Sequence, residues 1–267
     1  MKRNLFILLA LTVIAMSSCK QVADSEITKA STPELDYFQL KIFNYETEEQ
    51  VALLDNYFGD ALLPALHRAG VENVGVFKPI EGLNESINYI MVLVPFQSLE
   101  QFEKLPALLE QDPAYQQAGL AYIDAPHDNP PFTRIESFIL RAFSATPSLA
   151  LPELTSPRAD RVYELRSYEG ATEKLYKLKV EMFNEGESAL FQDLKFNPVF
   201  FCEVISSSHM PHLIYLTTHA DTTAQKANWD AFVAHPEWLR MKELERYQNT
   251  VSSITKYLLY PTEYSDY

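Results

Sequence analysis

AHPEW, at Ala234–Trp238, has a near-copy in the same chain, QDPAY at Gln111–Tyr115. Each pentapeptide follows a run with helical spacing, and each places a polar residue, His235 or Asp112, directly before a proline. A polar N-cap followed by proline is a typical helix start, because the missing proline N–H costs nothing at the first helical position. The same helix start at two corresponding points indicates an internal repeat.

Extending the alignment outward from these turns pairs four segments of each half, all rich in apolar and β-branched residues as strands are. The pairs are Tyr37–Tyr45 with Arg161–Glu169, Gly75–Glu81 with Val199–Ile205, Asn88–Phe96 with Pro211–His219, and Phe132–Leu140 with Ser252–Tyr260. The alignment places Leu40 on Leu165 and Lys41 on Arg166. We therefore predict four strands in each half, in matching order.

A helix is predicted after the first strand and after the third strand of each half. Thr47-Glu48-Glu49-Gln50 has the pattern of a capping box, and Ser98 and Thr222 are predicted to cap the later helices. Each half then reads β-α-β-β-α-β, which is the ferredoxin-like split unit. One such unit covers a single face of its sheet with helices. We therefore predict an α+β fold in which two ferredoxin-like sheets pack face to face as a barrel within one chain.

The first residues, MKRNLFILLALTVIAMSSC, place Lys2 and Arg3 before an apolar run at Leu5–Met16. A run of this length is too short to span a bilayer and is typical of a secretory signal. Met16-Ser17-Ser18-Cys19 resembles a bacterial lipoprotein processing box, which implies lipidation of Cys19 and a periplasmic or surface-facing place in the cell envelope. An ordinary cleaved signal, with Cys19 incidental, is the alternative.

The predicted organisation has five parts, namely a signal peptide at 1–18, a flexible tether at 19–36, a first repeat at 37–143, a proline-rich linker at 144–160 and a second repeat at 161–267. The net charge of the whole sequence is −14 at pH 7. Such a surface repels phosphate backbones and anionic headgroups, so nucleic acid is not predicted as a partner and membrane contact is predicted through the lipid alone. Cys202, in the run VFFCEVI, is predicted to be a small buried hydrophobe.

The second half resembles the NIPSNAP domain family. The residues that carry the resemblance are Tyr163-Glu164-Leu165-Arg166-Ser167-Tyr168, the run around Trp229, Pro236-Glu237-Trp238, and Leu259-Tyr260-Pro261. The first half is similar to a more diverged copy, with Tyr115 where the second half has Trp238. Together they resemble two-repeat bacterial lipoproteins of this family. The resemblance implies a dimeric α+β barrel fold formed here by two halves of one chain, and it implies no settled activity.

Strand alternation predicts which side chains meet the helices. Phe38, Leu40, Ile42, Tyr163, Leu165 and Ser167 are expected to face the helices, and Gln39, Lys41, Phe43, Glu164, Arg166 and Tyr168 to face the lumen between the sheets. Arg134 and Glu136, on the fourth strand, are expected to face the lumen too. The predicted ligand-binding residues are Lys41, Arg134, Glu136, Glu164, Arg166 and Tyr168. Three interpretations stay open, namely ion pairs that join the sheets, a pocket in which an arginine fork holds an anionic or carbonyl-bearing ligand, or simple solvent exposure.

A loop at Ala121–Arg134 supplies Asp124, His127 and Asp128, which could bind a metal or act as acid and base, or could be an ordinary exposed loop. His209 and His212 flank a predicted hairpin turn, but two histidines make half a metal site, so no metal is predicted. No cofactor is predicted either. Haem enters only by analogy with the wider barrel superfamily, which also includes monooxygenases, isomerases and plain binding proteins.

The leading functional prediction is a small-molecule binding or accessory protein, with the ligand between the two sheets. The first alternative is a cofactor-independent monooxygenase or isomerase that uses the same cavity, with Glu164 or His212 as base. The second alternative is a protein-interaction module that docks through its acidic surface and has no pocket. The predicted partners are accordingly a small molecule or another protein, and a homodimer is compatible with each alternative.

Overall fold

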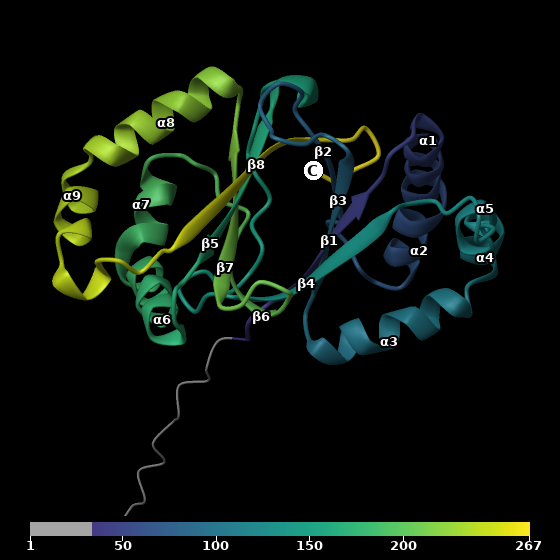
Figure 1. Ribbon diagram of the computed structural model, residues 1–267, viewed down its shortest axis with the longest axis horizontal. Helices are drawn as coiled ribbons and strands as arrows, with labels where there is room; N and C mark the ends of the chain where they lie inside the picture. Colours follow the sequence, from purple (N-terminus) through teal and green to yellow (C-terminus); the bar gives the residue numbers. More distant parts are fainter. Residues whose placement is uncertain (1–33) are drawn as a thin grey trace, which may run out of the picture. The chain divides into compact units, whose positions relative to one another are not determined.

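The computed structural model describes residues 34–267, in which eight strands and the helices follow the order β-α-β-β-α-β twice (Figure 1). The strands are β1 (Tyr37–Asn44), β2 (Gly75–Pro79), β3 (Tyr89–Phe96), β4 (Arg134–Ala142), β5 (Val162–Glu169), β6 (Phe200–Ser206), β7 (His212–His219) and β8 (Ser253–Pro261). All eight predicted strands are confirmed, with ends within two residues of those expected. The predicted signal peptide, Cys19 and the tether up to residue 33 lie outside the described residues.

The helices cover the outer faces of the two halves. They are α1 (Glu48–Asn56), α2 (Leu63–Arg68), α3 (Leu99–Glu110), α4 (Pro113–Ala118), α5 (Leu120–Ile123), α6 (Glu173–Met182), α7 (Ser188–Asp193), α8 (Thr222–Ala234) and α9 (Pro236–Lys242). Two π-helical segments, η1 (Tyr57–Leu62) and η3 (Phe183–Glu187), continue α1 and α6, and two short 3-10 turns are η2 (Arg158–Asp160) and η4 (Glu245–Tyr247).

The helix starts follow the predicted capping chemistry closely. Thr47 and Gln50 form the capping box of α1, and the Ser98 side chain accepts from the backbone of α3. Asp112 and His235 cap α4 and α9, each directly before a proline. The cap of α8 is Asp221 rather than the expected Thr222. The aspartate carboxylate satisfies the backbone N–H of Ala224, so the helix begins with Thr222 inside its first turn.

The strands close into one antiparallel barrel of eight, in the order β1-β3-β2-β8-β5-β7-β6-β4. The first half has the order β4-β1-β3-β2 and the second half has the order β8-β5-β7-β6, which is the same ferredoxin-like arrangement twice. The halves join along two seams, where β2 pairs with β8 and β4 pairs with β6. The predicted fold class is therefore confirmed.

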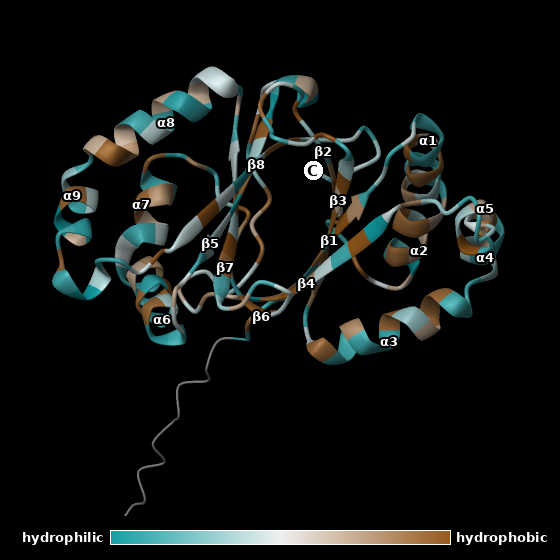
Figure 2. Ribbon diagram, viewed as in Figure 1, coloured by the Kyte–Doolittle hydropathy of each residue, from teal (hydrophilic) through white to brown (hydrophobic). Residues whose placement is uncertain are grey.

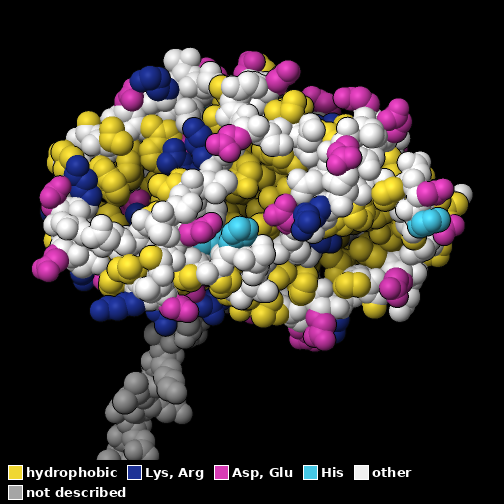
Figure 3. All heavy atoms as spheres, in the orientation of Figure 1, with side chains coloured by type: hydrophobic (Ala, Val, Ile, Leu, Met, Phe, Trp, Pro, Cys, Tyr) yellow, Lys and Arg dark blue, Asp and Glu magenta, His cyan; other side chains and the backbone are white. Residues whose placement is uncertain are grey.

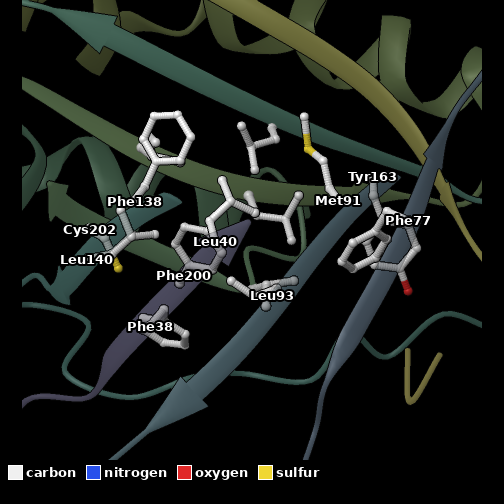
Figure 4. Packing of buried hydrophobic residues seen from close by; sticks show 14 of the residues in the cluster. Phe38, Leu40, Phe77, Met91, Leu93, Phe138, Leu140, Tyr163, Phe200 and Cys202 are labelled. Carbon is white, nitrogen blue, oxygen red and sulfur yellow. The ribbon is translucent and has the colours of Figure 1, made fainter. Parts of the chain in front are cut away.

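The lumen of the barrel is packed with apolar side chains. One buried cluster takes residues from all eight strands, among them Leu40, Leu93 and Cys202 (Figure 4). Phe38 of one half stacks on Phe200 of the other with ring centroids 5.1 Å apart. Cys202 is fully buried there, as predicted, and burial raises the pKa of its thiol. The centre of the lumen is thus a hydrophobic core.

Two further clusters lie between the sheet and the helices, one in each half. Figure 2 shows apolar residues concentrated along the strands, while α3 and α8 carry polar and apolar residues together. Because both faces of each half-sheet are covered, β7 is buried along its whole length and β3 along nearly all of it. None of the helices within residues 34–267 is long and apolar enough to cross a membrane.

The predicted facing of β1 and β5 is wrong and must be reversed. Phe38, Leu40, Ile42, Tyr163 and Leu165 belong to the lumen cluster, and Ser167 also faces the lumen, at its edge. Gln39, Lys41, Phe43, Glu164, Arg166 and Tyr168 face the helices instead. The prediction assigned the more apolar set to the helices. In a closed barrel the lumen is the drier environment, and on the outer face the Glu164 carboxylate is satisfied by Gln225 and Trp229 of α8.

Candidate functional site

An open space of about 380 Å³ lies between the outer face of β1 and β3 and the helices of the first half. We call it the repeat-1 cavity. Its walls are mainly aliphatic and aromatic side chains of η1, α2, α3 and α4, and its polar lining residues are Gln39, Lys41, Glu110 and Gln116 together with two tyrosines. Figure 3 shows hydrophobic side chains gathered over the first half on the face in view. The volume falls in the range of small-molecule sites.

Lys41 is the one basic side chain that lines the repeat-1 cavity. It is half-buried on β1, and burial lowers the pKa of its ammonium group below the ordinary value of 10.5. Among the residues that the structure describes, no carboxylate forms an ion pair with it, and burial is accordingly the only cause of the pKa shift. A partly dehydrated cation without a partner, facing an apolar space, is prepared to bind an anion.

Aromatic side chains form a fixed wall of the same cavity. The hydroxyls of Tyr57 and Tyr115 share a hydrogen bond of 2.9 Å, and the Tyr57 ring stacks on Tyr122 with centroids 3.6 Å apart. Burial raises the pKa of Tyr57 far above its ordinary value, so its phenol stays neutral. Two rings locked in this way give the cavity a preformed apolar surface for a flat ligand.

The corresponding space in the second half is filled by a polar network. Glu164 is fully buried and accepts three hydrogen bonds, from Arg166 Nε at 2.7 Å, Gln225 Nε2 at 2.8 Å and Trp229 Nε1 at 2.7 Å. The Tyr168 hydroxyl adds a 2.7 Å hydrogen bond to Tyr215. We call these six residues the repeat-2 network. Its carboxylate is held by donors on two elements, so it fastens α8 to β5.

A comparison of equivalent positions explains why one half is open and the other is filled. Lys41 pairs with Val92 across the β1–β3 ladder, and Arg166 pairs with Tyr215 across β5–β7. Continuing the gap-free alignment through the helices places Pro106 of α3 on Trp229 of α8. The second half therefore has tyrosine and tryptophan where the first half has valine and proline. Because valine and proline fill less volume than tyrosine and tryptophan, the first half contains the repeat-1 cavity where the second half is packed.

The six predicted ligand-binding residues do not converge on one space. Lys41 lies in the repeat-1 cavity, while Glu164, Arg166 and Tyr168 lie in the repeat-2 network on the far side of the barrel wall. Glu136 does face the lumen, at its edge, and Arg134 is exposed at the start of β4. Glu164 is also a poor candidate base, because its oxygens are fully occupied by donors. The prediction that these six residues converge was wrong because it assigned the wrong faces of β1 and β5 to the lumen.

A second space, of about 200 Å³, opens at one end of the lumen, and we call it the barrel-mouth cavity. Its floor belongs to the lumen cluster, and its rim carries Glu136, Ser167, Glu169, His209 and His212 with Thr255 and Tyr257. His212 is almost fully buried, with Nδ1 2.7 Å from the Ser167 hydroxyl and Nε2 2.8 Å from the Ser207 hydroxyl. Burial, with a smaller effect of His209, lowers the pKa of His212 to about 4.

The loop candidates stand apart from both cavities. Residues Leu120–Ile123 form α5, so the predicted loop is shorter than expected, and Asp124, His127 and Asp128 are exposed. Within residues 34–267 no group of three His, Cys, Asp or Glu side chains is placed to hold a metal ion. Neither a metal role nor an acid–base role for this loop gains support from the structure.

The fold is shared with solved structures of very different sequence. A monooxygenase-like protein from Lactobacillus acidophilus aligns over 85% of this chain and 94% of its own, with a TM-score of 0.58 and 9% identity. Another, from Fusobacterium nucleatum, covers 85% and 92%, with a TM-score of 0.52 and 7% identity. An anthrone oxidase-like protein covers 86% and 93%, with a TM-score of 0.52 and 12% identity. These likenesses place the chain in the dimeric α/β barrel class of folds.

Within that class, the family model of NIPSNAP matches residues 163–266. The second repeat is therefore a NIPSNAP domain, and the family predicted from its motifs is confirmed. The match begins at β5 and ends after β8, so it contains the repeat-2 network whole. No curated protein matches the chain.

Proposed function

We propose that the protein binds a small carboxylate with an aromatic or alicyclic body in the repeat-1 cavity, with Lys41 as the counter-ion. The observation that carries the proposal is the half-buried Lys41 ammonium group, which lines a mainly apolar space and forms no ion pair with a carboxylate of residues 34–267, although Glu110 lines the same cavity. A carboxylate bound there would pair with Lys41 in surroundings drier than water, where the attraction is stronger. Its ring would lie against the locked tyrosine wall.

This proposal moves the ligand from the centre of the lumen to the space beneath the helices of the first half. The centre is a packed core, whereas the repeat-1 cavity is nearly twice the volume of the barrel-mouth cavity. Monooxygenase and oxidase names among the structural neighbours belong to those proteins. What they share with this chain is the fold, which does not by itself decide an activity.

A thermal-shift series tests the proposal. Benzoate, phenylacetate and cinnamate would be compared with the corresponding alcohols, which keep the ring and lose the charge. A ligand at 100 times its dissociation constant adds about 2.7 kcal/mol to the free energy of unfolding. At about 2–4 °C per kcal/mol for a chain of this size, Tm should rise by about 5–10 °C.

Lys41→Met should remove the carboxylate shift, because methionine keeps the length of the side chain without its charge. Lys177→Met, at an exposed lysine of α6, is the matched control and should leave the shift intact. Equal shifts with acids and alcohols, or an undiminished shift in Lys41→Met, would remove Lys41 from the site. A flat response to the whole series would contradict a carboxylate ligand of this size.

A cofactor-independent oxygenase or isomerase remains the alternative proposal for the same cavity. Such an enzyme needs a base beside its substrate, and the lowered pKa of Lys41 makes its neutral amine more accessible than that of an exposed lysine. Incubating the protein with the carboxylate in air and under nitrogen, and measuring by chromatography whether the carboxylate is consumed, separates turnover from binding.

Lipid attachment at Cys19 and an envelope location also remain proposals. Incorporation of labelled palmitate that disappears in Cys19→Ser tests them.

A further inference from the structure

The barrel-mouth cavity combines three kinds of surface. Its floor is formed by side chains of the lumen cluster, including Leu165 and Phe138. One wall is the neutral hydrogen-bonding pair of Ser167 and His212. Its rim carries the carboxylates of Glu136, on β4, and Glu169, on β5. Apolar depth, a neutral acceptor and a charged rim together define a site for a small molecule rather than a patch of surface charge.

The two rim carboxylates lack a lysine or arginine partner among the described residues. No lysine or arginine within residues 34–267 forms an ion pair with Glu136 or Glu169, and the nearest basic group is His209 Nδ1, 3.8 Å from Glu169 Oε1. Glu136 accepts one hydrogen bond of 3.1 Å, from the Asn44 amide, which fixes its position and leaves its charge uncompensated. The whole sequence carries a net charge of −14, so the surrounding field also favours a cation.

Aromatic rings stand beside these carboxylates. Tyr257 lines the cavity and meets Tyr89 edge to face, with centroids 5.7 Å apart. Burial raises the pKa of Tyr257, and the nearby Glu136 carboxylate raises it further, so the phenol stays neutral and close to the charge. The Phe138 ring meets the His212 ring edge to face, with ring centroids 6.0 Å apart. Faces of such rings attract organic cations in addition to the carboxylates.

We propose that the barrel-mouth cavity is a second binding site, which takes a small primary ammonium compound with an apolar body. The ammonium group would meet the Glu136 and Glu169 carboxylates and donate to the Ser167 hydroxyl. The apolar body would point down onto Phe138 and Leu165. This site is separate from the repeat-1 cavity and selects the opposite charge. A chain of this kind can therefore bind an acid and an amine at once.

Isothermal titration with phenethylammonium tests this site, with phenethyl alcohol as the uncharged control of the same shape. We expect saturable binding of the ammonium compound and binding of the alcohol weaker by about tenfold or more, because the ion pairs are lost. Glu136→Gln and Glu169→Gln should each weaken binding of the ammonium compound by about tenfold. Glu173→Gln, at an exposed carboxylate of α6, is the matched control and should change nothing.

Lys41→Met keeps the two sites distinguishable, since it should abolish carboxylate binding and leave phenethylammonium binding unchanged. Glutamine at position 136 can still accept from Asn44, so the variant should fold, and its thermal melting curve verifies this. The proposal is overturned if phenethylammonium shows no saturable binding at millimolar concentration, if the alcohol binds equally well, or if the Glu136→Gln/Glu169→Gln double variant binds as the wild type does.

Discussion

The guanidinium carbon of Arg166 lies 3.7 Å from the centroid of the Trp229 ring, and both side chains donate to the same buried carboxylate, that of Glu164. The cation is thus held from one side by an aromatic face and from another by a negative charge. At the equivalent place in the first half, Lys41 has neither partner. This difference, set by a few side chains, separates a structural network from an open site.

Pro106→Trp should close the repeat-1 cavity. The new indole would occupy the place over Lys41 that Trp229 occupies over Arg166, so carboxylate binding should be lost. Stability should not fall, because proline inside α3 lacks a helical N–H and its replacement restores one. Thermal shift with phenylacetate and denaturant unfolding measure the two effects. Leu108→Trp, at an exposed position of the same helix, is the control and should bind normally. Normal binding by Pro106→Trp would place the ligand elsewhere.

Glu164→Gln should destabilise the second half strongly. The glutamine NH2 group would point toward N–H groups that now donate to the carboxylate. The positive charge of Arg166 would also lose its negative partner. Breaking a buried pair in this way costs about 3–5 kcal/mol. Guanidinium unfolding should show this loss, whereas Asp230→Asn, which breaks an exposed pair with Lys226, should cost less than about 1 kcal/mol. A loss of similar size in both variants would mean that the repeat-2 network is not a buried one.

Lys179 and Glu187 form a second buried pair, with Nζ and Oε2 2.6 Å apart. Burial raises the pKa of Glu187, and the nearby lysine opposes that rise. Lys179→Met should cost about 3–5 kcal/mol, because it leaves the carboxylate buried without a partner. Lys179→Met/Glu187→Leu should recover most of this loss, since no charge remains inside. Denaturant unfolding of the wild type, the two single variants and the double variant measures this coupling. Simply additive losses of unfolding free energy would contradict the pairing of Lys179 with Glu187.

Stability should fall as the pH is lowered from about 7 to 4. Burial is the main cause that lowers the pKa of His212 and of His219 to about 4, from an ordinary value of 6.5. Between these values the unfolded chain binds protons that the folded chain does not, so acidification favours unfolding. Each histidine contributes a slope of up to about 1.4 kcal/mol per pH unit. Well above pH 6.5 both states are neutral at these sites and the contribution is flat.

His212→Asn isolates one of these two contributions. Its free energy of unfolding, measured by urea titration at several pH values, should decline less steeply than that of the wild type between pH 6.5 and 4. The two slopes should coincide above pH 7. An identical slope for both proteins across the whole range would show that His212 titrates normally in the folded state.

The repeat and its strand order could be predicted from the sequence because they leave a signal in every element. Helix starts such as Asp112-Pro113 and His235-Pro236 use local chemistry, and matched strands such as Tyr37–Tyr45 and Arg161–Glu169 use local composition. Both depend on neighbours along the chain, so a single sequence contains them. The displaced cap at Asp221 shows the usual error of one residue at a helix end.

The sequence could not predict which face of each strand points into the lumen. Alternation separates the side chains into two sets but does not indicate which set faces the lumen and which faces the helices. Leu40 and Lys41 alternate clearly, yet both faces of β1 are covered in the barrel. The repeat-1 cavity escaped prediction for another reason. It depends on how Val92 of β3 and Pro106 of α3 fill one volume beside β1, and its signal appears only when they are compared with Tyr215 and Trp229.

The closure of the barrel by one chain has a consequence for the number of sites. In a symmetric homodimer a single substitution changes both copies of a pocket, so two identical sites must be kept or lost together. Here the two sheets are encoded separately, and the symmetry between them is only approximate. One half can hold the repeat-2 network around Glu164 while the other keeps the repeat-1 cavity around Lys41. The expected stoichiometry is therefore one carboxylate for each chain.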